Sequence, residues 1–368
     1  IYLSIYFGLF YWPINLVHHQ LQPSLRSRYN SKFGKLDVLL MILLSATSST
    51  TWAYWLQWKV LGCAIWVILP IAAVCIVLYR NRTYDPDRAI LFKDVETWIP
   101  FLNQVHPIWL LVYRIIALAY LLTVLGAELV TRGLRTYFFY TQWTFTLVTV
   151  YFGYACALSV FGCHRQLKQF NVDSSNRDDI ETIVQDNTQV PLVKDEVFIS
   201  PVGTRQEAVD DSHWFLLQAL LQMSGGAVIV TDVVFWCILY PFFASKEHSL
   251  DFAEINMHSM NAVLLLGDAA SNSLPVTMFG VCYVVLWSEL YVIFQWIFHA
   301  IKDITWPYPI LDLASPYAPL WYMAMALGHL ICYGVFMAAV NMSRSLLRKW
   351  FYESSSLKSE QKLPQHGK

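Results

Sequence analysis

The chain has 368 residues, of which 56% are hydrophobic and only 14% are charged. Soluble domains carry about a quarter charged residues, so this composition excludes an ordinary water-soluble protein and indicates an integral membrane protein. A net charge of −1 excludes a large basic surface for nucleic acid. The seven cysteines form no C-x-x-C pair, which argues against a disulfide framework or a zinc site, so we expect no metal or other cofactor.

Residues 1–58 form an N-terminal extension whose structure the sequence leaves open. The stretch 1–17 is apolar enough for one short span, and 37–54 resembles the core of a signal peptide followed by small residues. Neither reading is decisive. We therefore expect at most one short span in this part of the chain.

Seven longer runs have the length and composition of membrane spans. A helix needs about 20 mainly apolar residues to cross about 30 Å of hydrocarbon. Such runs lie at 59–79, 107–130, 137–162, 214–244, 256–277, 279–302 and 318–342. Backbone polar groups cannot remain unpaired in lipid, and the runs are too long for barrel strands. The sequence therefore predicts an all-α fold, a polytopic membrane helix bundle of about seven transmembrane helices.

Two polar segments divide the chain. Spans one to three fall in 59–162, and spans four to seven fall in 213–342. Between them, 163–212 is acidic and poor in aromatic residues, which predicts a flexible loop. The end of the chain, 343–368, is predicted to be a polar tail.

The distribution of lysine and arginine indicates the orientation. These residues are more frequent in the 80–106 loop, the 163–212 loop and the tail than in the segments of the opposite side. The positive-inside tendency then predicts a cytoplasmic C-terminus. Asn81, Arg82 and Thr83 form a glycosylation sequon on that same side, so a glycan on Asn81 would invert the orientation. No retrieval or lipidation motif indicates the organelle.

Polar residues interrupt the run 256–277 at helical intervals. Together with the apolar Leu265, these polar residues lie on a single narrow helix face: His258, Asn261, Leu265, Asp268 and Asn272. An ionisable side chain at mid-bilayer costs roughly 2.5–3.5 kcal/mol even on an insertion scale. We therefore expect this face to turn towards other helices. A site and a purely structural network are about equally compatible with the pattern.

Other predicted spans also carry polar residues. Asp232 lies in the middle of the fourth span. Further groups on the second, sixth and seventh spans are Arg114, Glu128, Ser288, Glu289, Gln295, His299 and His329. For His299 and His329, a hydrogen bond between helices is favoured over chemistry, because most polar residues in membrane bundles have this role.

Two stretches resemble a known family. They are FYTQWTFTLVTVYFG (139–153) and INMHSMNAVLLLGDAASNSLP (255–275), the latter followed by WPYPILDL. They resemble the rolling stone and androgen-induced membrane hydrolase-like group, and among its members chiefly the uncharacterised plant multi-pass transmembrane proteins. The likeness covers about 107–342. It implies a six-helix core with at least one additional N-terminal span.

The resemblance also implies a chemistry. The hydrolase branch cuts esters between one fatty acid and the hydroxyl of another, with an intramembrane threonine and histidine. The threonine corresponds to Thr141, and the first of two family histidines corresponds to His258. The second, catalytic histidine is replaced by Asn261, whose amide cannot act as a base. Asp268 lies about 15 Å along a helix from His258 and cannot orient it directly.

Three functions follow as hypotheses. The first is a lipid-ester hydrolase-like protein with Thr141 as nucleophile and His258 in place of the missing base. The second is a non-enzymatic membrane scaffold or receptor-like protein, in which a polar network supports the bundle. Its expected members are Asn261, Asp268, Asn272 and Asp232. The third, a transporter, has least support because no internal repeat is evident. Membrane lipid is the expected partner, and protein partners cannot be read from the sequence.

Overall fold

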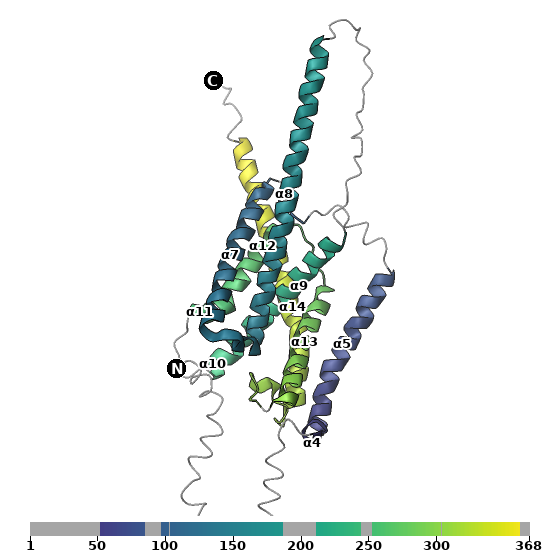
Figure 1. Cartoon of the computed structure of the whole chain (residues 1–368), viewed down its shortest axis with the longest axis vertical. Coiled ribbons are helices and arrows are strands. Elements are labelled where there is room, and N and C mark those ends of the chain that lie inside the picture. Colours follow the sequence, from purple (N-terminus) through teal and green to yellow (C-terminus); the bar gives the residue numbers. More distant parts are fainter. Residues whose placement is uncertain are drawn as a thin grey trace, which may run out of the picture.

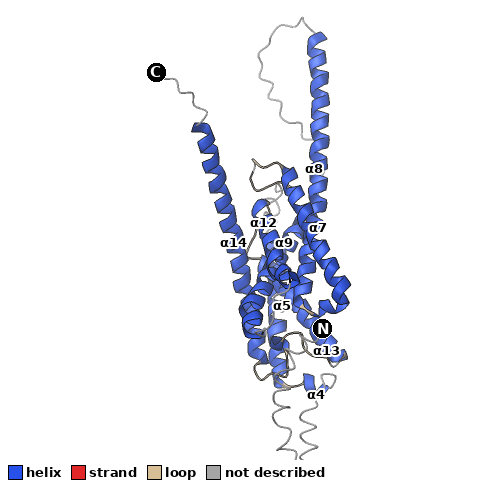
Figure 2. Cartoon of the chain, turned by 90° about the vertical axis from the view of Figure 1, so that its left-hand side faces the viewer, coloured by secondary structure: helices blue, strands red, loops and turns tan. Residues whose placement is uncertain are grey.

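The computed structural model describes residues 52–84, 97–102, 104–186, 211–243, 252–302 and 304–360. These residues form helices joined by short turns, and no β-strand occurs among them (Figure 2). The predicted all-α fold is confirmed. The span considered at 1–17 lies outside the described residues.

Within the described ranges, six helices are long and apolar enough to cross a membrane. They are α5 (Trp58–Tyr84), α7 (Pro107–Arg132), α8 (Tyr140–Asp186), α9 (Asp211–Val234), α13 (Gly280–Ile301) and α14 (Ala318–Glu360). The shorter elements are α4 (Trp52–Trp55), η1 (Gly133–Phe138), η2 (Phe235–Leu239), α10 (Tyr240–Phe243), α11 (Phe252–Ile255), η3 (Asn256–Met260), α12 (Asn261–Ser271) and η4 (Pro309–Leu311). The chain is thus built as a multi-pass membrane protein, and six of the seven predicted spans are found.

The run 256–277 is not the uninterrupted span that its length suggested. It consists of the π-turn η3 followed by α12, which ends at Ser271. Asn272 has extended backbone (φ −89°, ψ 164°), and Pro275, which follows, has no N–H for a helical hydrogen bond. The polar face of the short helix does not face hydrocarbon, because α7, α8, α9 and α14 pack against α12 (Figure 1), and of its large apolar residues Val263 remains exposed.

Two helices extend into segments predicted to be irregular. The expected loop 163–212 is helical as far as Asp186, and 187–210 lies outside the described residues. The expected tail 343–368 is helical as far as Glu360. Both helical portions are polar but contain neither glycine nor proline, so polarity there marks departure from the membrane and not the end of a helix. Both project beyond the bundle at one end (Figures 1 and 2).

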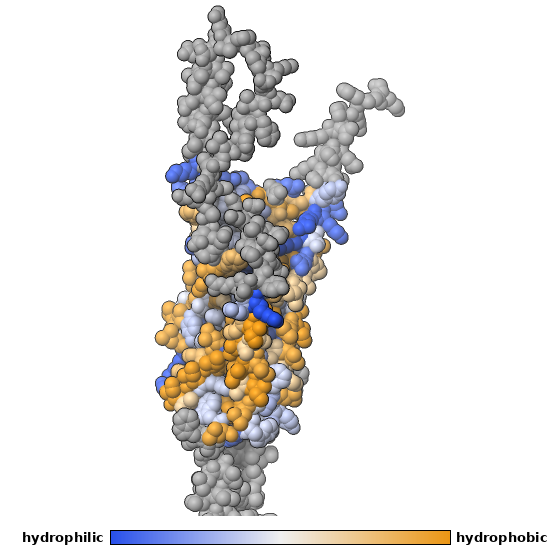
Figure 3. Space-filling view, turned by 90° about the vertical axis from the view of Figure 1, so that its right-hand side faces the viewer, coloured by the Kyte–Doolittle hydropathy of each residue, from blue (hydrophilic) through white to orange (hydrophobic). Residues whose placement is uncertain are grey.

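The surface of the bundle has the polarity of a membrane protein. Figure 3 shows a broad hydrophobic band, with hydrophilic residues towards the end from which α8 and α14 project. The outer face of α5 illustrates the band, since Leu61, Ile65, Ile68 and Ile76 are all exposed. In water such a surface would be unfavourable, whereas against acyl chains it is the expected one.

The apolar core lies around α12. Its largest fully buried members come from α7, α8, α9, α12 and α14: Leu121, Phe145, Tyr151, Phe152, Leu217, Leu221, Leu265, Tyr333 and Phe336. A second cluster joins α5 to α13 and to the 305–322 connection. The helices therefore form two groups that meet along α13 and α14.

The polar face of α12 is enclosed by this core. Asn261, Asp268 and Asn272 are completely buried, and His258 is 7% exposed. The expectation that this face turns towards protein is met. The helix carries these groups without exposing them to lipid, where each would be costly.

A buried ion pair satisfies the carboxylate of α12. Arg114 Nε on α7 donates to Asp268 Oδ1 at 2.8 Å, and both side chains are fully buried. Arg114 Nη1 also donates to Ser159 Oγ at 2.6 Å. The Tyr151 hydroxyl and Asn272 Nδ2 both donate to Asp268 Oδ2. Asp268 therefore joins α7, α8 and α12 in one network.

A second arginine fixes the end of α12. Arg344 on α14 donates to the carbonyl oxygens of Ala269 at 2.7 Å, Asn272 at 3.1 Å and Leu274 at 2.8 Å. These carbonyls have no helical partner because the helix has ended. The guanidinium replaces the missing donors and ties α14 to the turn.

The ion pair should control the stability of the bundle. Asp268→Asn leaves the Arg114 charge buried without a counter-charge, so we expect a loss of about 3–5 kcal/mol in the free energy of unfolding. Denaturant unfolding in detergent micelles measures this. The double variant Arg114→Met/Asp268→Leu should lose less than either single change, because no charge is then left unpaired. Single variants within about 1 kcal/mol of wild type would contradict this role.

Candidate functional site

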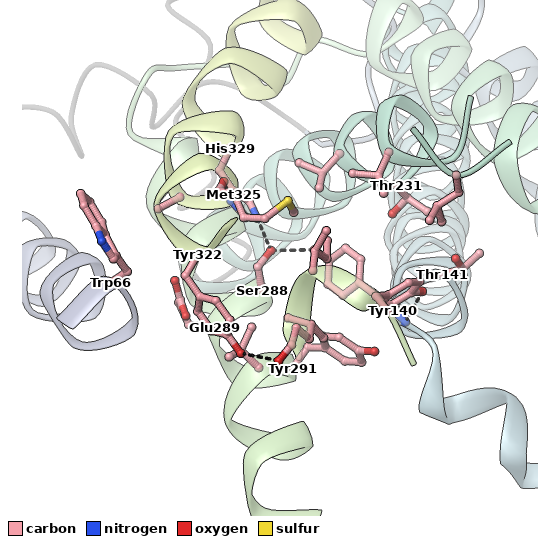
Figure 4. A pocket seen from close by; sticks show the side chains of 18 of the residues that line it. Trp66, Tyr140, Thr141, Thr231, Ser288, Glu289, Tyr291, Tyr322, Met325 and His329 are labelled. Carbon is pink, nitrogen blue, oxygen red and sulfur yellow. Dashed lines mark hydrogen bonds between the residues drawn. The ribbon is translucent and has the colours of Figure 1, made fainter. Parts of the chain in front are cut away.

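A cavity lies among α5, α8, α9, η2, η3, α13, η4 and α14. It measures about 800 Å³, counting the part that opens to the outside. Most of its lining is aliphatic or aromatic. Apart from the tyrosine hydroxyls, its polar groups belong to Thr141, Thr231, His258, Ser288, Glu289 and His329. Such a combination, a mainly apolar wall with a few convergent polar groups, is typical of a ligand site (Figure 4).

The structure brings Thr141 and His258 to the same cavity. Thr141 is the second residue of α8, which begins after the extended residue Phe139. The Tyr308 hydroxyl accepts a hydrogen bond from the Tyr140 backbone N–H at 3.1 Å, and the Thr141 hydroxyl bonds to the same phenol. Burial raises the pKa of Tyr308, so this phenol stays protonated. Among the described residues, no hydrogen bond joins Thr141 to His258.

His258 is held by residues of α9 and η2. Its ring stacks on Phe235 with the ring centroids 3.7 Å apart and an interplanar angle of 3°. Its carbonyl accepts from Trp236 Nε1 at 2.7 Å. Its Nδ1 lies 3.9 Å from Asp232 Oδ1, and both side chains are largely buried. Asp232 is thus the carboxylate beside this imidazole; no hydrogen bond joins the two atoms, so Asp232 can stabilise the charged form of the ring by its charge alone.

The π-turn η3 separates His258 from the rest of the predicted polar face. A π-turn adds one residue to the turn, so residues on either side of it no longer follow the 3.6-residue period. His258 lines the cavity, whereas Asn261, Asp268 and Asn272 do not. The spacing argument was therefore right for the residues within α12 and wrong for His258.

Asn261 and Asp268 take no part in the cavity. Asn261 Oδ1 accepts from the backbone N–H of Ala262 at 2.8 Å, and the residue is completely buried. Asp268 is bound within the Arg114 network. Both belong to the structural part of the bundle, as does Asn272.

A hydrogen-bonded group in the cavity was not expected from the sequence. Ser288 Oγ on α13 lies 2.8 Å from His329 Nε2 on α14 and 2.7 Å from the Tyr140 hydroxyl on α8. His329 Nδ1 lies 2.6 Å from the Met325 carbonyl and must donate to it. Nε2 is then an acceptor, so Ser288 donates to His329 and Tyr140 donates to Ser288.

This group has the form of a hydroxyl with its base already in place. The sequence placed Ser288 and His329 among the polar residues of their spans. It could not show that they meet, because spacing along one helix says nothing about the rotation of another. Glu289, the neighbour of Ser288, was expected from its charge to face other helices, a cavity or a partner, and it lines the cavity.

The chain matches no family model, no curated protein and no solved structure. The likeness to the rolling stone and androgen-induced hydrolase-like group therefore rests only on the stretches 139–153, 255–275 and 306–313 of the sequence. Among the described residues, no group of three or more histidine, cysteine or acidic side chains could hold a metal ion.

Ser288 should contribute to stability through its two partners. Ser288→Ala leaves His329 Nε2 unpaired in an apolar wall and removes one hydrogen bond of the Tyr140 hydroxyl, so we expect a loss of about 1–3 kcal/mol in the free energy of unfolding. Ser345→Ala is the matched control, because this exposed serine bonds only to Asn341 of its own helix; it should change stability by less than about 0.5 kcal/mol. Equal effects of the two changes would contradict the assignment.

Proposed function

We propose that this protein is a membrane-embedded hydrolase that cuts lipid esters in the cavity. The observation that supports this most is the convergence of Thr141 and His258. They are 117 positions apart in the sequence, yet they line one cavity. They are also the two positions to which the family resemblance assigned a nucleophile and a histidine.

In the proposed reaction, Thr141 Oγ attacks the ester carbonyl carbon while its proton passes to the imidazole of His258. The C–O bond to the leaving alcohol then breaks, and the alcohol takes the proton from His258. A water molecule attacks the acyl-threonine with the same base, and this releases the fatty acid and restores the hydroxyl. Asp232 stabilises the transient imidazolium.

Two features of the site fit a lipid substrate. The wall is mainly apolar, so it suits an acyl chain. The cavity is partly open and is bordered by helices with exposed apolar faces, which suits entry of a lipid from the bilayer. Proton transfer requires Thr141 and His258 to approach each other, and such contacts commonly tighten only when substrate is bound.

The same cavity contains the Ser288–His329 pair, which is hydrogen-bonded already. An ester bound there would meet a second hydroxyl with a base. The reaction class is the same with either nucleophile. Variants of Thr141 and Ser288 therefore separate the question of which hydroxyl reacts from the question of whether esters are cut.

The test is turnover of lipid esters by the purified protein in nanodiscs, with esters of hydroxy fatty acids in the panel. Thr141→Ala and His258→Gln should each lower turnover at least about 100-fold, because nucleophile or base is removed. Ser345→Ala should not change it. If Ser288→Ala loses ester turnover while Thr141→Ala keeps it, the nucleophile is Ser288 and not Thr141. Absence of turnover by folded wild-type protein would contradict the proposal.

A non-enzymatic scaffold is the second candidate, and the Arg114–Asp268 network favours it. This network satisfies the most polar part of α12 without contacting the cavity, as expected for a purely structural role. A scaffold predicts that Asp268→Asn impairs assembly while Thr141→Ala has no effect at all. The transporter hypothesis is weakened, because Asp268 is held by Arg114, Tyr151 and Asn272 and is not free to relay protons.

A further inference from the structure

Glu289 is a buried acidic residue that has no partner in the described part of the chain. It lies on α13, is 8% exposed and lines the cavity. No hydrogen bond or ion pair joins its carboxyl to a described residue. A buried ionisable group in a membrane protein normally has a partner, since leaving it alone in an apolar wall is costly.

Four of the described cations have partners away from Glu289. No lysine or arginine lines the cavity. Lys59 donates to the Ala314 carbonyl at 3.1 Å, and Lys302 lies over the Phe298 ring. Arg114 and Arg344 belong to the network at α12. Among the described residues, therefore, none supplies a positive charge to Glu289.

The two histidines of the cavity do not fill this role. His329 uses both ring nitrogens, towards Met325 and Ser288. His258 has its own carboxylate, Asp232. Among the described residues, no side chain is therefore placed to supply the complementary charge for Glu289, and a bound molecule is the remaining source of one.

Aromatic side chains surround this part of the cavity. Trp66, Tyr140, Tyr291 and Tyr322 line it together with Glu289, and Figure 4 shows Tyr322 beside Glu289. Tyr140 and Tyr322 are near enough to interact electrostatically with Glu289. The faces of aromatic rings attract cations, and a carboxyl with several rings is a common way to hold an ammonium group.

We propose that the cavity selects lipids whose polar group is an amine cation, held by Glu289 and the surrounding rings. This rests on the proposed function in taking the cavity as the lipid site, and it narrows the substrate to an amine-bearing ester lipid. Esters of hydroxy fatty acids carry a free carboxylate, which would meet Glu289 with like charge and without a compensating cation. They are therefore the poorer substrates.

Binding tests this independently of catalysis. The purified full chain is titrated with hexadecylamine, hexadecanol and palmitate, which share one chain length, and affinity is followed by the shift in unfolding temperature. Hexadecylamine should bind wild type at least about tenfold more tightly than palmitate. Glu289→Gln should abolish this preference without changing hexadecanol binding. Glu128→Gln, at a buried carboxyl that pairs with Arg132, should retain the preference.

Two results would overturn the assignment: equal binding of hexadecylamine and palmitate to wild type, or an unchanged amine preference in Glu289→Gln. If Glu289→Gln does not fold, Trp66→Leu replaces it and should weaken hexadecylamine binding severalfold. An unchanged affinity of Trp66→Leu for hexadecylamine would then contradict the assignment. Amine binding without ester turnover would contradict the proposed function alone. Ester turnover without amine preference would contradict this inference alone.

Discussion

The pairing of Arg114 with Asp268 is the interaction on which the rest of the bundle depends. Two opposite charges inside hydrocarbon are stable only if they meet and if their remaining hydrogen-bonding positions are filled. Ser159, Tyr151 and Asn272 fill those positions. The requirement draws α7 and α8 against α12, so a short helix with a polar face becomes the centre of the bundle.

This arrangement also positions the cavity. Helix α8 carries Tyr151 into the Asp268 network, and its first turn carries Tyr140 and Thr141 to the cavity. The segment formed by η3 and α12 likewise carries Asp268 into the ion-pair network and His258 to the cavity. One end of these two elements is therefore locked by charge, while the other borders a space with reactive groups. Rigid support of this kind keeps a hydroxyl and an imidazole at fixed positions.

The sequence predicted those features that depend on hydropathy and local periodicity. Six spans, the all-α fold and the buried face Asn261–Asp268–Asn272 follow from the cost of polar groups in lipid. The π-turn at His258 was not predictable, because an added residue leaves no mark in composition. The helical extension to Asp186 was missed because polarity was equated with irregular structure. The contacts of Ser288 with His329, and of Asp232 with His258, depend on the rotation of packed helices.

The central claim is that a lipid occupies the cavity with its polar group at Glu289. A cryo-electron microscopy map of the protein in lipid nanodiscs with an amine-bearing lipid tests this most directly. The account predicts elongated density bordered by α5, α13 and α14, with its polar end at Glu289 and near Thr141. A map in which side chains fill this space, or in which the polar face of α12 contacts acyl chains, would contradict it.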